Sequence, residues 1–355
     1  MRIGGRARRL PRRRLWFDAA LAVVGGGLAV WRLAPTLAHV PNLGARLTGL
    51  GWGWLALALL LAVTSLAGYG ELQLRLLMAG GARISGIKVQ AITFIGNAIT
   101  QAVPSGGSLA GGGYSVAALQ RRGVDAALAV WTVAMGIVLT SMTMAVMAPL
   151  CLAAGHFLSV PVAVTLSVVI ATLCWAGWSA IRRPHVVDAI ARGILAVARQ
   201  LPVLRHTDWP ARQSARVNQF AQRISHLQPR PAQWVALIAA ALATWMLDYL
   251  ALAACVAATS STIPWAAVAV GYLLVQISIG LQLTPGGTGP AEAGLLAALV
   301  SGGIPGASAA IVVVVYRIIT LFVLALVGWA VFLGNAMRPA HRQADQSTTG
   351  RSRPH

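Results

Sequence analysis

The chain has 355 residues, of which 57% are hydrophobic and only 10% are charged. Soluble globular domains carry roughly 25% charged residues, so this composition excludes an ordinary soluble protein and indicates a polytopic membrane protein. A formal net charge of +20 is also typical of nucleic-acid-binding proteins. The distribution of the basic residues explains that charge by membrane topology instead, so we predict no nucleic-acid partner.

Six apolar runs are long enough to cross a bilayer as helices. About 20 helical residues cross a hydrocarbon core, and lipid cannot satisfy exposed backbone groups, so we predict an all-α fold. The expected spans are residues 15–33, 52–72, 126–152, 158–181, 234–258 and 307–333. The first run follows a basic N-terminal segment, residues 1–14, as in a signal peptide, but no convincing small-residue cleavage site follows. We therefore interpret it as a membrane anchor and expect one transmembrane domain over residues 15–333.

Two pairs of shorter apolar segments lie between these spans. The first pair is 87–103 with 109–119, and the second is 265–283 with 290–300. A proline and a glycine-rich break joins the two members of each pair. The break residues are Pro104, Gly106 and Gly107 in the first pair and Pro285, Gly286, Gly287 and Gly289 in the second. Because irregular backbone in a membrane needs surrounding protein or a water-filled cavity, we predict two re-entrant hairpins; two ordinary glycine-rich turns are the alternative.

The basic residues decide the orientation of this topology. With the N-terminus in the cytoplasm, 25 of the 28 Lys and Arg lie on the cytoplasmic side. Only Arg32 and Arg46 lie outside, and Arg317 lies within the last span. This asymmetry agrees with the positive-inside rule, whereas a first hairpin that crossed the membrane would move the nine arginines of the loop 182–230 outside.

The same topology relates two parts of the chain by inversion. The first hairpin enters the membrane from the cytoplasm and the second from the outside, so the units 52–152 and 234–333 have opposite orientations. Inverted repeats with broken helices near the bilayer midplane are typical of secondary transporters. The sequence therefore predicts a transporter core.

Three charged residues lie at membrane depth, where charges are costly and mark functional sites. Glu292 begins the second half of the second hairpin, Arg317 lies in the last span, and Asp248 lies in the span 234–258. Arg317 needs a carboxylate partner, and Glu292 and Asp248 are the two candidates. In a functional interpretation Arg317 meets a phosphate while Glu292 or Asp248 carries a proton or binds a cationic head group; the alternative is an ion pair that only locks the hairpin to the helix. Glu71 and Arg75 are spaced for an ordinary salt bridge within one helix.

Uncharged groups also point to an anion site. Gly286, Gly287 and Gly289 precede a helix that we expect to begin near Pro290, so its free N–H groups could face a lipid phosphate. The amides expected to line the same cavity, or to form hydrogen bonds between helices, are Asn97, Gln101, Gln276 and Gln282.

The rest of the chain carries no recognisable catalytic pattern. Its three cysteines lie singly in apolar runs, and its seven histidines lie in loops or tails without metal-binding spacing. We therefore predict no enzyme, metal or cofactor. Within the cytoplasmic loop 182–233, residues 209–227 have the pattern of an amphipathic interfacial helix, with a solvated basic loop as the alternative. We expect residues 334–355 to be a disordered cytoplasmic tail.

The second break resembles a motif of a known family. The stretch Leu283 to Glu292, followed by Gly302-Gly303 and a span with Arg317, resembles the flippase-like transmembrane domain family. This is the family of the lysylphosphatidylglycerol synthase membrane region, also called multiple peptide resistance factor. The residues similar to its earlier motif are Asn97, Pro104, Gly106, Gly107, Arg122 and Gly123. The resemblance covers residues 52–333.

The resemblance implies movement of a lipid or lipid-linked head group between leaflets. Two-part members of the family carry a soluble aminoacyl-transferase domain after the membrane part. This sequence ends at His355, too soon after the last span for such a domain, so we expect a stand-alone translocator.

We therefore predict a flippase for a phospholipid or a lipid-linked glycan that works by alternating access around the two hairpins. Abundant Ala, Arg and Trp suggest a bacterial source, and we expect a plasma-membrane protein with both termini in the cytoplasm. An integral-membrane transferase acting on a lipid or polyprenyl phosphate is the first alternative. The second is a non-catalytic partner of a cell-envelope synthesis complex, in which Glu292 and Arg317 would be dispensable; a homo-oligomer is left open.

Overall fold

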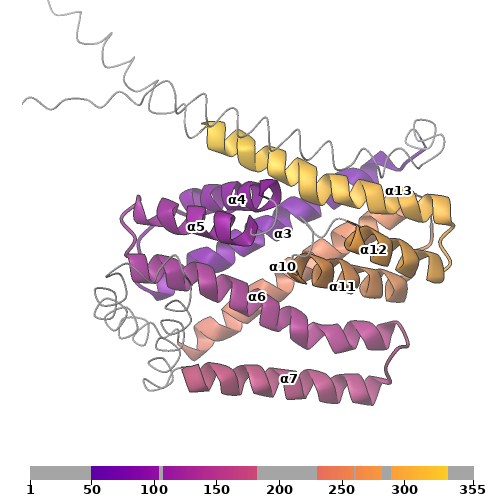
Figure 1. The fold of residues 1–355 in the computed structure, drawn as a ribbon, viewed down its shortest axis with the longest axis horizontal. Coiled ribbons are helices and arrows are strands. Elements are labelled where there is room, and N and C mark those ends of the chain that lie inside the picture. Colours follow the sequence, from indigo (N-terminus) through magenta and orange to yellow (C-terminus); the bar gives the residue numbers. More distant parts are fainter. Residues whose placement is uncertain (1–48, 104–106, 182–229, 260, 282–288, 335–355) are drawn as a thin grey trace, which may run out of the picture.

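The computed structural model describes residues 49–103, 107–181, 230–259, 261–281 and 289–334, and these residues form helices without any β-strand (Figure 1). The helices before the central loop are α3 (Trp52–Ala79), α4 (Gly86–Ala102), α5 (Gly107–Gln120), α6 (Ala126–Ala154) and α7 (Val160–Ile181). Those after it are α10 (Pro231–Ala257), α11 (Trp265–Leu281), α12 (Pro290–Ser301), α13 (Gly306–Arg317) and the π-helix η2 (Ile318–Val323).

Five of the predicted spans are long apolar helices. They are α3, α6, α7, α10 and the last span, Gly306–Gly334, which contains α13 and η2. The chain is therefore a multi-pass all-α membrane protein. The predicted span 15–33, the amphipathic segment 209–227 and the tail lie outside the described residues, as do the hairpin tips 104–106 and 282–288.

Glycines end several of these helices. Gly80 follows α3 and Gly302 follows α12, and the next residues, Gly81 and Gly303, have φ angles of +81° and +90°. Side chains disfavour such angles, whereas glycine adopts them readily. The break expected at Gly302 and Gly303 is thus confirmed as a helix terminus.

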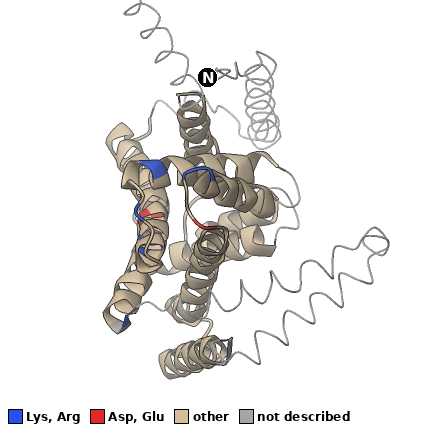
Figure 2. Cartoon of the chain, turned by 90° about the vertical axis from the view of Figure 1, so that its left-hand side faces the viewer, with Lys and Arg blue, Asp and Glu red and all other residues tan. Residues whose placement is uncertain are grey.

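Contacts between helix termini define two ends of the bundle. At one end the Trp178 ring of α7 packs edge-on against Trp234 of α10, with 5.1 Å between ring centroids. At the opposite end the backbone N–H of Gly51 donates to the carbonyl of Ala258 at 2.9 Å, so α3 and α10 are antiparallel. Within the described part of the chain, every Lys and Arg except Arg317 lies at the first end, which we call the basic end (Figure 2): Arg75, Arg83, Lys88, Arg121, Arg122 and Arg230.

The two hairpins enter the bundle from these opposite ends. The α4–α5 hairpin has its base at the basic end, where Lys88 lies in the first turn of α4 and Arg121 follows α5. The α11–α12 hairpin has its base at the opposite end, where Gly302 lies against Pro264 at the start of α11. Figure 1 shows the first pair on the left and the second on the right. The arrangement predicted from the sequence, two oppositely oriented hairpins, is present.

Small residues bring the two helices of the first hairpin together. Gly107, Gly111 and Ser115 recur every four residues on one buried face of α5. A Cβ atom added at Gly111 would lie only 2.5 Å from the carbonyl oxygen of Gly96 on α4. Helices in membranes approach closely through such small-residue faces, so these glycines fix the hairpin by packing.

The two repeats pack against each other symmetrically. α3 runs along α10 in the most extensive helix contact of the described structure, and the Ser65 hydroxyl donates to the Thr244 carbonyl across it at 2.9 Å. α6 packs against α10 and α11 of the second repeat. The last span makes the corresponding contacts with α3 and with α4, where Gly328 lies against Phe94 and Ala98. The final helix of each repeat thus packs against helices of the other repeat.

Candidate functional site: a polar cavity between the repeats

A cavity of about 300 Å³ lies where the two repeats meet. Its walls come from α3, α4 and α6 of the first repeat and from α10, α11 and the last span of the second. The polar residues that line it are Ser65, Tyr69, Asn97, Gln101, Thr140, Thr244, Asp248, Gln276, Tyr316, Arg317 and Thr320. A volume of this size is at the lower end of the range for ligand sites, about 300 to 1,000 Å³.

Twelve of the nineteen lining residues form pairs that occupy equivalent positions in the two repeats. Tyr69 is as far from the first residue of α3 as Asp248 is from the first residue of α10. The same relation links Asn97 with Gln276 and Ile137 with Arg317 on the other helices. The full set of lining pairs is Ser65 with Thr244, Leu66 with Trp245, Tyr69 with Asp248, Asn97 with Gln276, Ile137 with Arg317 and Thr140 with Thr320. The cavity therefore lies on a pseudo-two-fold axis.

The charge in this cavity comes from the second repeat alone. Asp248 and Arg317 line it, whereas their equivalents in the first repeat are Tyr69 and Ile137. The site is thus symmetric in backbone and asymmetric in charge.

Arg317 is held by an ion pair inside the protein. Its Nε lies 2.6 Å from Oε1 of Glu292, and Arg317 is only 1% exposed while the Glu292 side chain is 18% exposed. A buried charge without a partner is strongly destabilising. The expected carboxylate partner of Arg317 is confirmed, and Glu292 takes that role.

Glu292 also caps the helix that carries it. Its Oε2 accepts a hydrogen bond from the backbone N–H of Gly289, the residue before α12. Gly289 has a φ of +94°, a conformation that favours glycine. The carboxylate therefore binds one of the backbone N–H groups that we expected to face an anion. Because it also pairs with Arg317, it links the start of α12 to the last span.

Asp248 has a different set of partners. Its Oδ2 accepts hydrogen bonds from the Tyr272 hydroxyl at 3.1 Å and from Nε2 of Gln276 at 3.0 Å. Its Oδ1 accepts one from the Tyr316 hydroxyl at 3.3 Å. All three of these hydrogen-bond donors are neutral groups. Tyr272 and Tyr316 were missed in the sequence, because nothing in an apolar run marks a tyrosine as a partner of a distant aspartate.

A π-helix, Ile318–Val323, follows directly after Arg317. Short π-helical segments inside α-helices often occur at functional sites. Two of its residues, Thr320 and Leu321, line the cavity. The sequence predicts a continuous apolar helix here and gives no signal for this irregularity.

The family model for the lysylphosphatidylglycerol synthase TM region matches residues 19–328. The chain belongs to this family. The matched residues include the first repeat, the second repeat up to residue 328 and all the residues that line the cavity. The family assigns the chain a membrane lipid-related role. A comparison with curated proteins found no match.

In this member of the lysylphosphatidylglycerol synthase TM-region family, the remaining predicted site residues divide into three groups. Asn97, Gln101 and Gln276 line the cavity, as expected. Gly107 is instead buried against the Thr100 backbone and acts in packing. Those that lie outside the described residues are Pro104, Gly106, Gln282, Pro285, Gly286 and Gly287.

Proposed function

We propose that this protein moves a phospholipid or a lipid-linked glycan between the two leaflets by alternating access. The observation that carries the proposal is a polar cavity on the pseudo-two-fold axis of two repeats whose hairpins enter from opposite ends. Inverted repeats that meet at a central site are the architecture of many transporters, in which one repeat rocks against the other. By the positive-inside rule the basic end faces the cytoplasm, in a bacterial plasma membrane.

The ion pair gives substrate binding a means to release the second hairpin. A lipid phosphate that enters the cavity competes with Glu292 for Arg317, since guanidinium groups bind phosphate and carboxylate in the same way. Glu292 then no longer ties α12 to the last span, and the hairpin is free to move. When the phosphate leaves toward the other leaflet, the pair forms again and resets the protein.

Asp248 is the candidate for coupling this cycle to protons. It lines the cavity, and all its hydrogen-bond donors in the described structure are neutral. Protonation removes its charge and weakens the bonds from Tyr272 and Tyr316. Because Tyr316 immediately precedes Arg317, a change at Asp248 reaches the phosphate site directly.

Reconstitution into liposomes tests the proposal. A fluorescent phospholipid in the inner leaflet becomes accessible to a membrane-impermeant quencher only if it is moved outward. We expect the intact protein to accelerate this exchange over empty liposomes, and Glu292→Gln and Arg317→Ala to reduce the acceleration at least tenfold. Glu71→Gln and Arg75→Ala are matched controls, because that pair is 2.9 Å apart but about 40% exposed on α3.

Two results would contradict the proposal. Exchange at the rate of empty liposomes, for both a fluorescent phospholipid and a lipid-linked glycan, would exclude transport of those lipids. Full exchange by the Glu292 and Arg317 variants would leave the pair as a structural lock only. A chemically modified lipid recovered after incubation would favour an integral-membrane transferase.

A further inference from the structure

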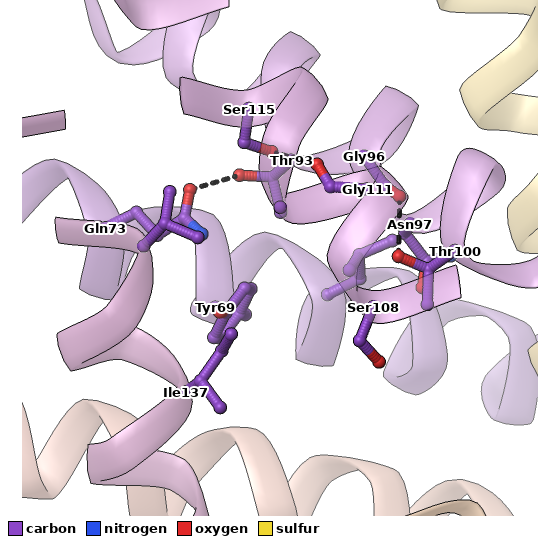
Figure 3. Close-up of a pocket in the computed structure, with 13 residues that line it drawn as sticks. Tyr69, Gln73, Thr93, Gly96, Asn97, Thr100, Ser108, Gly111, Ser115 and Ile137 are labelled. Atoms are coloured by element: carbon purple, nitrogen blue, oxygen red, sulfur yellow. Dashed lines mark hydrogen bonds between the residues drawn. The ribbon is translucent and has the colours of Figure 1, made fainter. Parts of the chain in front are cut away.

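A second cavity lies beside the first, inside the first repeat. It measures about 190 Å³ and its walls come from α3, α4, α5 and α6 (Figure 3). The residues that it shares with the first cavity are Leu66, Tyr69, Asn97 and Ile137. The two cavities therefore have a common wall.

The lining of this second cavity is polar but uncharged. None of its described lining residues is Asp, Glu, Lys, Arg or His. Its polar side chains are hydroxyls and amides, from Tyr69, Gln73, Thr93, Asn97, Thr100, Ser108 and Ser115. The cavity with Asp248 and Arg317 is thus extended by a neutral compartment.

Three hydroxyls of this compartment have their protons engaged and leave their oxygens as acceptors for a ligand. Thr100 donates its hydroxyl proton to the Gly96 carbonyl at 2.9 Å, and Ser115 donates to the Gly111 carbonyl at 3.0 Å. The single hydroxyl proton of Thr93 lies between two acceptors, Oε1 of Gln73 at 3.3 Å and the Val89 carbonyl of its own helix at 3.1 Å. A hydroxyl whose proton is engaged in this way still presents its oxygen lone pairs. Such oxygens accept hydrogen bonds from ligand hydroxyls.

The side-chain amide of Asn97 adds a hydrogen-bond donor to these acceptors. Nδ2 of Asn97 is buried without a hydrogen-bond partner among the described residues, and Asn97 lies in the wall common to both cavities. Buried polar groups are normally paired, so this amide points to a missing acceptor. Acceptors on the walls together with a free donor match a ligand hydroxyl, which both donates and accepts.

We infer that the two cavities form one composite site, in which Arg317 takes the phosphate of a lipid and the neutral compartment takes an uncharged head group bearing hydroxyls. The inference rests on the proposed function and names its substrate class: a phosphate-linked glycerol or sugar. The compartment has room for roughly six waters at about 30 Å³ each, which suits a glycerol or one sugar ring. An ammonium head group meets no carboxylate there among the described residues.

The inference is tested by binding, separately from transport. The purified protein is titrated in a sugar-free detergent with phosphatidylglycerol and with phosphatidylmethanol, which has the same phosphodiester without hydroxyls. Polyprenyl-phosphoryl glucose and polyprenyl methyl phosphate form the matching pair for a sugar. We expect at least one hydroxylated lipid to bind about threefold to tenfold more tightly than its partner, the effect of one net hydrogen bond, and phosphatidylethanolamine to gain nothing over phosphatidylmethanol.

Two variants of the compartment sharpen the test. Thr93→Val and Ser115→Ala remove hydroxyls, and we expect them to abolish the preference while leaving the affinity for the hydroxyl-free lipids unchanged. Thr143→Val is the matched control, because Thr143 is equally buried on α6 but lines neither cavity. A purely structural role for these hydroxyls would lower all affinities together.

The outcomes separate the inference from the proposed function. Equal affinity for lipids with and without hydroxyls, an equal loss for both in the variants, or no lipid binding by the intact protein overturns the inference. The variants can show that a hydroxyl preference depends on Thr93 and Ser115 while no leaflet exchange occurs in liposomes. That result would support the composite site and contradict transport. Exchange without such a preference keeps transport and overturns the composite site.

Discussion

The Nε atom of Arg317 lies 2.6 Å from Oε1 of Glu292, and this pair joins the last span to the first turn of α12. The second oxygen of the same carboxylate accepts the Gly289 N–H. One side chain therefore holds both the arginine of the cavity and the start of the second hairpin's returning helix. In the function that we propose, this link couples anion binding to hairpin movement.

Glu292→Gln is expected to lower the stability of the protein far more than Glu71→Gln. Breaking a buried pair costs about 3 to 5 kcal/mol, whereas an exposed pair contributes about 0 to 1 kcal/mol. Thermal unfolding of the two variants in detergent, followed by loss of helical signal, measures the difference. Similar shifts for the buried and the exposed pair would contradict the burial argument.

The double variant Glu292→Gln with Arg317→Gln separates stability from transport. Because it leaves no unpaired charge, we expect it to unfold at a higher temperature than Glu292→Gln alone. It lacks the guanidinium that we propose binds the phosphate, so we expect lipid exchange in liposomes to stay lost. Recovery of exchange along with stability would show that the pair serves only the fold.

Asp248→Asn is expected to reduce lipid exchange at least tenfold in a protein that remains folded. The amide cannot carry a proton as a carboxylate does, and its NH₂ group faces donors from Tyr272, Gln276 and Tyr316. Tyr316→Phe removes the longest of these bonds, at 3.3 Å, and should have a smaller effect. Wild-type exchange by Asp248→Asn would remove this residue from the transport cycle.

Gly111→Ala and Gly113→Ala should change the unfolding temperature in opposite directions. At Gly111 the new Cβ would lie 2.5 Å from the Gly96 carbonyl oxygen, whereas at Gly113 nothing lies within 4 Å. The first change forces α4 and α5 apart and lowers the unfolding temperature. The second raises it slightly, because alanine is favoured over glycine in a helix by about 1 kcal/mol. Equal behaviour of the two variants would mean that α4 and α5 are not packed this closely.

Single cysteines at the bases of the hairpins should be labelled from opposite sides of the membrane. Arg121 lies after α5 at the basic end, and Thr262 lies between α10 and α11 at the other end; both are exposed. In a variant without the three native cysteines, an impermeant thiol reagent should reach Arg121→Cys only from the cytoplasm and Thr262→Cys only from outside. Labelling of both from one side would rule out the inverted arrangement.

The sequence predicted the architecture well, because the bilayer imposes it locally. Long apolar runs must become helices, so four of the spans from α3 to the last helix could be placed within a few residues, whereas α3 continues to Ala79, beyond the predicted end at residue 72. The proline and glycine breaks predicted the two hairpins, and the distribution of the basic residues predicted their opposite orientations. Even the need of Arg317 for a carboxylate followed from the cost of an unpaired charge in lipid.

The sequence alone determined the helices from α3 onward, the opposite orientation of the two hairpins and the presence of a costly charge among apolar helices. Only the tertiary structure decided that Glu292 pairs with Arg317, that tyrosines hold Asp248, and that a π-helix follows the arginine. It also decided that the hydroxyls of Thr93 and Ser115 share a neutral compartment. The physical reason is that hydropathy acts on each segment separately, whereas a binding site is made by side chains that only the packing of distant helices brings together.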